Sequence, residues 1–185
     1  MEHILYSNII NHLDENNILT DMQHGFRKNH SCESQLLISV NDFAINMNNC
    51  EQIDSILLDF SKAFDKVNHR KLCLKLHHYG IRGKNLNWIK CFLMNRTQQV
   101  VLNGKKSSIA PVTSGVPQGT VLAPILFLIY INDLTSYVNS TIRLFADDAY
   151  LYRKVETQED TRILEKDLEN LEVWEKMHME FHRQM

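Results

Sequence analysis

The stretch LFADDAYLY, residues 144–152, places two adjacent carboxylates, Asp147 and Asp148, among apolar and aromatic neighbours. Apolar side chains alternate on both sides of the pair, as they do in a half-buried β-hairpin. At an effective dielectric constant of about 20, two like charges some 4 Å apart repel by roughly 4 kcal/mol. We therefore predict a hairpin with Asp147 and Asp148 at its tip and a bound cation that offsets the repulsion. A surface turn with two solvated aspartates is the alternative.

A third carboxylate, Asp59, stands at the end of the apolar run DSILLDF, residues 54–60, which fits a central β-strand. SGVPQGTVLAPILFLIYINDL, residues 114–134, opens with two glycines and a proline, which predict a tight loop whose backbone can approach a ligand. Carboxylates on neighbouring strand ends supply the hard oxygen ligands that Mg²⁺ prefers, and two cations about 3.5–4 Å apart serve phosphoryl transfer. The sequence therefore indicates a two-metal site.

Helical and strand-like patterns follow one another without a repeat or a linker. Apolar side chains at helical spacing predict helices at residues 2–15, 32–43, 72–79, 86–93, 121–134 and from Thr157 onward. Ser31 is the expected N-cap of the second helix, and Asn103-Gly104 between strand-like segments is a strong hairpin signal. Helices mixed with antiparallel strands predict an α+β fold.

The bulk composition is that of an ordinary globular chain. It has 185 residues, 44% of them hydrophobic, which suits one domain with a buried core. Apolar runs fall short of the roughly 18–20 residues of a membrane span, and the first residues lack the pattern of a signal peptide. We therefore expect an intracellular protein without a membrane segment.

The net charge of −2 conceals a basic segment. Residues 62–106 hold eleven Lys and Arg side chains against the single acidic Asp65, a net charge of +10. One interpretation is a solvated face that acidic neighbours balance in the fold. The other is a surface that contacts phosphates, whose binding would weaken as the salt concentration rises.

Four ordered segments resemble motifs of reverse transcriptases, in particular those of non-LTR (LINE-like) retrotransposons. QHGFRKNHSCESQL, residues 23–36, is similar to the fingers-side motif, and DSILLDFSKAFDKVNHRKL, residues 54–72, is similar to the first palm motif. The segments around PQG and ADD follow as later palm motifs. The likeness implies a right-hand palm with an antiparallel sheet and packed helices. It implies partial fingers at 1–52, a palm at 53–185 that is truncated at its C-terminal end, and no thumb.

The resemblance implies metal ligands. Asp59 and Asp147 match the main ligands, with Asp148 beside them in support, and the backbone carbonyl of Phe60 matches an additional ligand. The implied cofactor is a pair of Mg²⁺ ions, for which Mn²⁺ can substitute. Another two-metal palm polymerase is the alternative, and the SGVPQG segment weakens it.

The resemblance also implies a nucleotide-binding set. Backbone N–H groups around Lys62, Ala63 and Phe64 would face the triphosphate, as anion-binding turns do. The Phe64 ring would leave no room for a ribose 2′-OH; its alternative role is that of a core aromatic. Gln118 matches a position against the incoming nucleotide and the template, and Gly119 would permit close backbone approach.

The implied partners are an RNA template, a DNA primer and a dNTP, and the family resemblance alone points to the nucleus. Arg27 resembles a fingers-side basic contact. By comparison with the family, we expect the sequence to lack the first fingers stretch, the primer-gripping hairpin, the thumb and an endonuclease, as in a fragmentary retrotransposon copy or an incompletely predicted gene. Two hypotheses follow: an RNA-directed DNA polymerase core, or a catalytically inactive remnant that at most binds nucleic acid.

Overall fold

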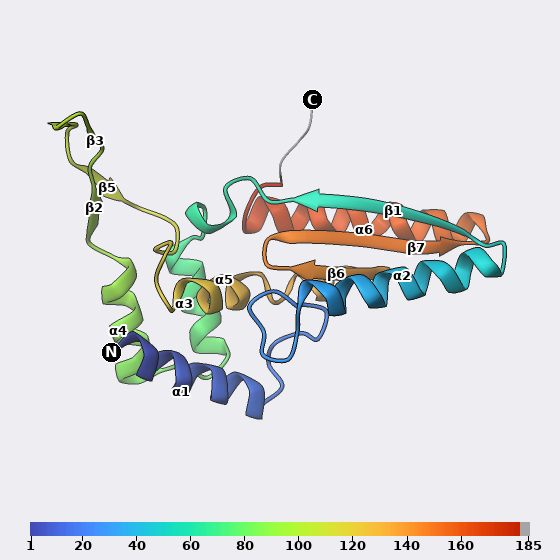
Figure 1. Ribbon diagram of the computed structural model, residues 1–185, viewed down its shortest axis with the longest axis horizontal. Helices are drawn as coiled ribbons and strands as arrows, with labels where there is room; N and C mark the ends of the chain where they lie inside the picture. Colours follow the sequence, from blue (N-terminus) through green and yellow to red (C-terminus); the bar gives the residue numbers. More distant parts are fainter. Residues whose placement is uncertain (182–185) are drawn as a thin grey trace. The chain divides into compact units, whose positions relative to one another are not determined.

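The computed structural model describes residues 1–181 and forms two compact units, which we describe separately (Figure 1). Unit 1 comprises Met1–Ile18 and Lys62–Tyr130, and unit 2 comprises Leu19–Ser61 and the chain from Ile131 onward. Both units contain helices and antiparallel strand pairs, which confirms the α+β prediction. No helix within residues 1–181 is both long enough and apolar enough to cross a membrane.

A three-stranded antiparallel sheet is the centre of unit 2. Its strands are β1 (Gln52–Asp59), β6 (Thr141–Phe145) and β7 (Asp148–Val155), in the order β1-β7-β6. The prediction of a central strand for DSILLDF is therefore wrong, because β7 is central and β1 lies at the edge of this sheet. The apolar run misled because Leu57, although apolar, faces solvent with 82% of its surface exposed.

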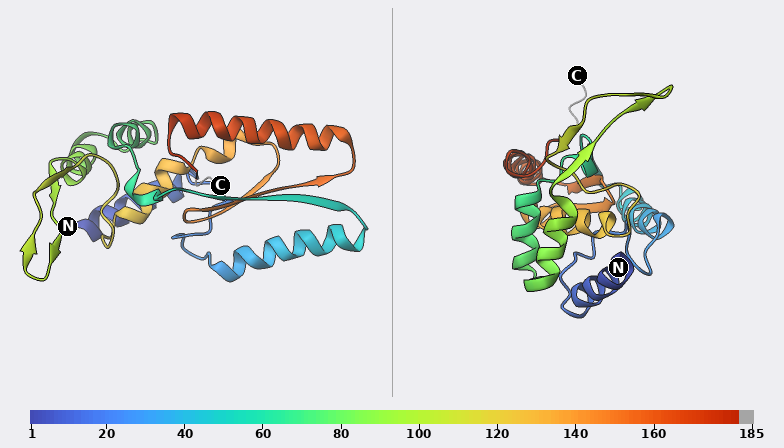
Figure 2. Two further views of the ribbon diagram at one scale, coloured as in Figure 1. Left: turned by 90° about the horizontal axis from the view of Figure 1, so that it is seen from above. Right: turned by 90° about the vertical axis from the view of Figure 1, so that its left-hand side faces the viewer.

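Two long helices flank the sheet of unit 2 on opposite faces (Figure 2). Ser31 is the N-cap of helix α2 (Cys32–Asn48), as predicted. Its side chain accepts a hydrogen bond from the N–H of Ser34, and the Ser34 side chain accepts one from the N–H of Ser31, which completes a capping box. Helix α6 (Gln158–Met177) begins at Thr157 with a second capping box. Its apolar stripe is buried on the sheet, whereas much of the apolar face of α2 remains exposed.

Unit 1 is mainly helical. Its elements are α1 (Glu2–Glu15), the short η1 (Ala63–Asp65), α3 (His69–His78), α4 (Gly83–Leu93), and α5 (Ala123–Ile131), which crosses into unit 2 with its last residue. One apolar stripe of each of α1, α3 and α4 is buried, in agreement with the helical spacing of its residues, whereas Ile4 and Leu74 are exposed. Helix α5 is buried along most of its length, but it ends at Ile131, and a 3₁₀ turn, η2 (Leu134–Tyr137), follows.

Two short antiparallel pairs complete unit 1. They are β2 (Arg96–Gln98) with β5 (Ala110–Val112), and β3 (Val101–Leu102) with β4 (Lys105–Lys106). Asn103 and Gly104 connect β3 to β4 with φ angles of +49° and +77°. This confirms the predicted hairpin, because two-residue turns between antiparallel strands favour Asn-Gly in left-handed conformations.

Candidate active site

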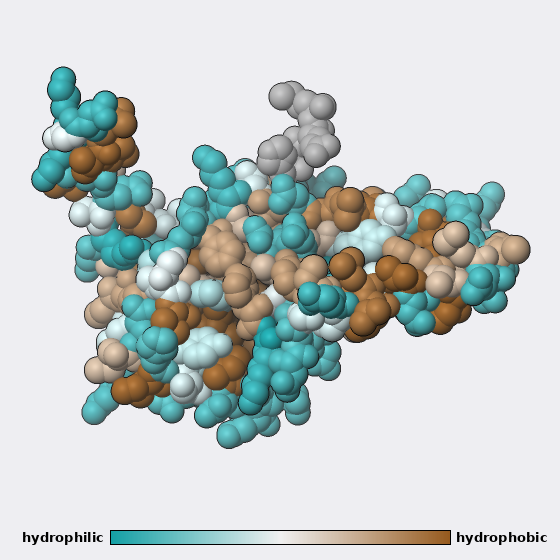
Figure 3. Space-filling model, in the orientation of Figure 1, coloured by the Kyte–Doolittle hydropathy of each residue, from teal (hydrophilic) through white to brown (hydrophobic). Residues whose placement is uncertain are grey.

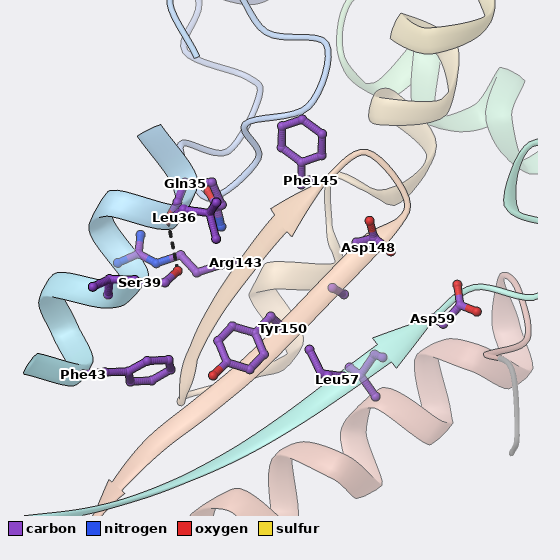
Figure 4. A pocket seen from close by; sticks show the side chains of 13 residues that line it. Gln35, Leu36, Ser39, Phe43, Leu57, Asp59, Arg143, Phe145, Asp148 and Tyr150 are labelled. Carbon is purple, nitrogen blue, oxygen red and sulfur yellow. Dashed lines mark hydrogen bonds between the residues drawn. The ribbon is translucent and has the colours of Figure 1, made fainter. Parts of the chain in front are cut away.

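Asp59 and Asp148 lie opposite each other at one end of the sheet of unit 2 (Figure 4). Asp59 is the last residue of β1 and Asp148 the first of β7, and the two are Cα partners in the antiparallel register. Side chains that are directly opposite in such a pair lie on the same face. Phe145 also pairs with Asp148, so the hairpin turn consists of Ala146 and Asp147. The tip is thus one residue earlier than predicted, and Asp148 belongs to the strand.

The two neighbouring carboxylates act electrostatically on Asp148. Partial desolvation raises the pKa of the largely exposed Asp148 carboxyl above its ordinary value, and the negative charges of Asp147 and Asp59 raise it further. A cation would relieve this repulsion, and carboxylate oxygens are the donors that Mg²⁺ prefers. Within residues 1–181, no three His, Cys, Asp or Glu side chains already form a ligand set around one point. The donor chemistry fits a divalent cation, and the carboxylates are neighbours of one another.

A groove of about 790 Å³ adjoins the two opposed carboxylates. It lies between α2 and the sheet, and its lining includes Asp59, Asp148, Leu57 and Tyr150 (Figure 4). Apolar surface between β1 and α2 is visible in Figure 3. The groove therefore combines an acidic end with an apolar floor.

A polar network fixes α2 to the sheet beside this groove. Arg143 on β6 donates to Asp42 on α2 at 3.1 Å, and the hydroxyl of Tyr152 on β7 donates to the same carboxylate. Burial and the hydrogen bond to Asp42 raise the pKa of Tyr152 to about 12. No local sequence signal indicates this network, because Asp42 lies 101 positions from Arg143 and 110 positions from Tyr152 along the chain.

Unit 1 brings together the residues with predicted nucleotide-binding roles. Lys62 adopts a left-handed conformation with a φ of +54° and caps η1, which contains Ala63 and Phe64. The loop 114–119 lies against this turn, since the Gln118 side-chain amide donates to the carboxylate of the last residue of η1 at 2.9 Å. Turn and loop thus form one surface within unit 1.

Phe64 and Gly119 differ in how enclosed they are. The half-buried Phe64 ring stacks on Phe127 with a centroid distance of 4.6 Å, so it also serves the core of unit 1. Gly119 has a φ of +80°, and a Cβ atom there would meet nothing within 4 Å. The positive φ of Gly119 favours glycine at this position, and a ligand could approach its backbone without meeting a neighbouring atom. The roles of both residues toward a nucleotide stay predictions.

A cleft of about 470 Å³ in unit 1 adjoins the same turn and loop. Its lining includes two cationic side chains, Lys62 and Arg96, together with Asp65 and Gln118. Arg96 belongs to the basic segment 62–106, but the number of charges in a segment does not indicate which cation faces a cleft. Two cations in a largely polar cleft suit a phosphate-bearing ligand.

Arg27 and Phe60 have structural contacts in unit 2. The Arg27 guanidinium donates to the backbone carbonyl of Thr20 at 3.1 Å and braces its own loop. Phe60 is buried directly after β1, where its ring stacks on Phe181 at a centroid distance of 4.7 Å. The fingers contact of Arg27 and the metal-binding role of the Phe60 carbonyl stay predictions.

Solved structures define the class of fold. Telomerase from Candida albicans, solved with a fragment of telomeric RNA, aligns with a TM-score of 0.69 and 12% identity over 96% of this chain and 34% of that one. Telomerase from Candida tropicalis aligns with a TM-score of 0.68 and 13% identity over 98% of this chain and 32% of that one. At such identities the likeness shows the fold alone, which is the α+β palm of a right-hand polymerase.

The sequence then identifies the family. Residues 3–180 match the family described as reverse transcriptase (RNA-dependent DNA polymerase), and the chain belongs to it. The RNA-directed DNA polymerase from the mobile element jockey of Drosophila melanogaster is 33% identical over 83% of this chain and 18% of its own length. The RNA-directed DNA polymerase from the mobile element jockey of Drosophila funebris is 29% identical over 94% of this chain and 20% of its own length. The chain thus spans about a fifth of these relatives. Reverse transcriptases generally depend on divalent metal ions.

Proposed function

We propose that this chain is the core of a retrotransposon RNA-directed DNA polymerase, which adds a deoxynucleotide to the 3′-OH of a DNA primer on an RNA template. The observation that carries the proposal is the register of β1 with β7, which sets Asp59 opposite Asp148 while Asp147 occupies the adjoining turn. Membership of the reverse transcriptase family supports the same reaction.

Asp59, Asp147 and Asp148, with the backbone carbonyl of Phe60, are the proposed ligands of two Mg²⁺ ions, and Mn²⁺ is the proposed substitute. The raised pKa of Asp148 supports this role, because closely spaced carboxylates gain most from a bound cation. Such a metal pair, when bound, activates the attacking hydroxyl and stabilises the leaving oxygen. The contribution of the protein is to hold the carboxylates together at one end of the sheet.

The turn at Lys62, Ala63 and Phe64 and the loop residues Gln118 and Gly119 are the proposed nucleotide-binding residues. The left-handed turn and the hydrogen bond from Gln118 to it support a preformed surface. Unit 1 has eleven basic and four acidic side chains, a net charge of +7, which favours contact with the phosphates of template and primer.

The assignment of residues 1–52 to partial fingers and 53–185 to the palm is likewise part of the proposal. The two compact units are divided at other positions, because they group segments by contact within the fold. Residence in the nucleus follows from the proposed retrotransposon function alone.

Primer extension on an RNA template tests the proposed function. Purified wild-type chain is assayed with dNTPs and Mg²⁺ beside Asp147→Asn, which keeps the side-chain shape and removes the charge. Asp21→Asn, which changes an exposed carboxylate of the same unit, is the matched control. We expect extension by the wild type and the control and its loss in Asp147→Asn. Extension by Asp147→Asn at the wild-type rate would contradict the metal-binding role.

The second candidate is a nucleic-acid-binding remnant, which the basic segment 62–106 favours. It predicts RNA binding that weakens with salt and is unchanged in Asp147→Asn, with no extension by the wild type. Filter binding at several salt concentrations, run beside the extension assay, separates the two candidates.

A further inference from the structure

The turn that carries Asp147 contains a strained residue. Ala146 has a φ of +53°, in the left-handed region that residues with a Cβ atom rarely adopt. Hairpin turns usually place glycine at such a position, because glycine has no side chain to clash with the backbone. Something other than local preference therefore has to hold Ala146 in this conformation.

The side chain of Gln23 supplies that constraint. Its carboxamide oxygen accepts a hydrogen bond from the N–H of Ala146 at 2.9 Å, and its nitrogen donates to the carbonyl of the same residue at 3.1 Å. The oxygen also accepts from the N–H of Gly25 at 2.7 Å. Gln23 is only 2% exposed, so water does not compete for these bonds. One amide thus joins both backbone groups of the strained residue.

The backbone around Gln23 reinforces the contact. Leu144 on β6 donates its N–H to the carbonyl of Met22 at 2.9 Å, and its carbonyl accepts from the N–H of His24 at 2.9 Å. A Cβ atom on Gly25 would lie 2.1 Å from the Ala146 nitrogen, so only glycine allows this approach. Residues 22–25 therefore form a fixed support along the end of β6 and its turn.

We infer that Gln23 is a positioning residue, whose carboxamide holds Ala146 in the left-handed conformation and so sets the position of Asp147. The importance of Gln23 for activity rests on the proposed polymerase function. The pair of hydrogen bonds between Gln23 and Ala146, which we call the clamp, does not depend on that function. The carboxamide offers a donor and an acceptor side by side on one planar group, which matches the N–H and carbonyl of a single residue. Glutamate would keep the acceptor and lose the donor, and methionine would lose both while filling a similar volume.

Hydrogen exchange of the Ala146 amide tests the clamp without any need for activity. In Gln23→Met we expect the exchange rate of this amide to rise by roughly tenfold or more, since its buried hydrogen-bond partner is lost. Gln52→Met, at an exposed glutamine on β1, is the matched control and should leave the rate unchanged. Equal protection of Ala146 in Gln23→Met and the wild type would overturn the inference.

A rescue experiment separates positioning from general stability. Ala146→Gly removes the cost of the positive φ, so the turn needs less support from Gln23. Mn²⁺ binding is measured by titration with the metal alone. In the protein with the wild-type Ala146, we expect Gln23→Met to weaken this binding by about tenfold. The loss should be smaller when Ala146→Gly is the reference. An equal loss in both backgrounds would show a role unrelated to the strained turn and would overturn the inference.

Primer extension then distinguishes this inference from the proposed function. If the polymerase function holds, Gln23→Met and Gln23→Glu should require more Mg²⁺ for half-maximal extension, while Gln52→Met should not. Extension by the wild type with an unchanged Mg²⁺ requirement in both Gln23 variants would overturn the positioning role and leave the function standing. No extension by the wild type, together with faster exchange at Ala146 in Gln23→Met, would overturn the function and leave the clamp standing.

Discussion

Replacement of Asp148 by asparagine is expected to stabilise the metal-free protein. The change removes the charge that faces Asp59 across the strand pair and follows Asp147 in the chain. Directly opposite residues have Cβ atoms about 5 Å apart, where two like charges repel by roughly 0.8 kcal/mol in water. Asp148 is largely exposed despite its partial desolvation, so salt screens its repulsion by both neighbours, and we expect a gain of about 1 kcal/mol in the free energy of unfolding.

The gain should depend on pH with a defined sign. The pKa of Asp148 is raised in the folded protein, so the wild type carries the full repulsion only when the pH is above that raised value. As the pH falls through it, Asp148 becomes protonated and resembles asparagine. The advantage of Asp148→Asn should therefore be largest near pH 7 and vanish below the ordinary value of about 3.9.

Thermal melts in EDTA measure this effect. A gain of about 1 kcal/mol corresponds to a rise in Tm of roughly 2–4 °C for a chain of this length. Asp21→Asn, at an exposed carboxylate, should leave Tm unchanged. Saturating Mg²⁺ should stabilise the wild type more than Asp148→Asn and reduce the difference. A Tm of Asp148→Asn at or below that of the wild type in EDTA at pH 7 would refute the electrostatic argument.

Three further changes have expected outcomes. Asp167→Ala should lower the free energy of unfolding in urea by about 2–4 kcal/mol, because the fully buried carboxylate accepts from two backbone N–H groups of 139–140; a loss under about 1 kcal/mol would contradict this. Gly115→Ala should lower Tm more than Gly119→Ala. Both residues have a positive φ angle, but only at Gly115 would a Cβ atom lie 2.8 Å from a backbone oxygen. Equal losses of Tm in the two variants would argue against this clash. Phe64→Ala should raise the incorporation of ribonucleotides in the extension assay, and unchanged sugar selection would remove Phe64 from that role.

Local signals predicted the elements of the fold well. The N-cap Ser31, the start of the last helix near Thr157 and the Asn103-Gly104 turn depend on a few residues each, so a short window of sequence contains what determines them. The place of β1 in the sheet depends instead on which segments pair over long distances. An apolar run such as that around Leu57 looks the same whether it lies in a central strand or at an exposed edge.

In the candidate site too, local sequence signals predicted some features, whereas others depend on pairing between distant segments. Adjacency of the carboxylates follows from their motifs, but which aspartate faces Asp59 depends on the turn. A shift of one residue in register exchanges the two faces of a strand, so the two-residue turn at Ala146 and Asp147 decides that Asp148 is the opposed one. Gln23 was not predicted as a support, because it contacts Ala146 across 123 positions of sequence. That Asp147 is a main metal ligand and Asp148 a supporting one stays a prediction, which separate Asn variants test.

The distribution of charge gives the two units complementary tasks in the proposed reaction. Unit 2 has nine basic and eighteen acidic side chains, a net charge of −9, and unit 1 has a net charge of +7. An acidic unit repels a polyanion over distances of about 10 Å at 0.1 M salt, so the carboxylates can meet a triphosphate only when cations neutralise them. The long-range attraction of nucleic acid must then come from the basic side chains of unit 1. Substitution of those cations should therefore weaken RNA binding and its salt dependence, whereas loss of an aspartate should abolish extension and leave binding intact.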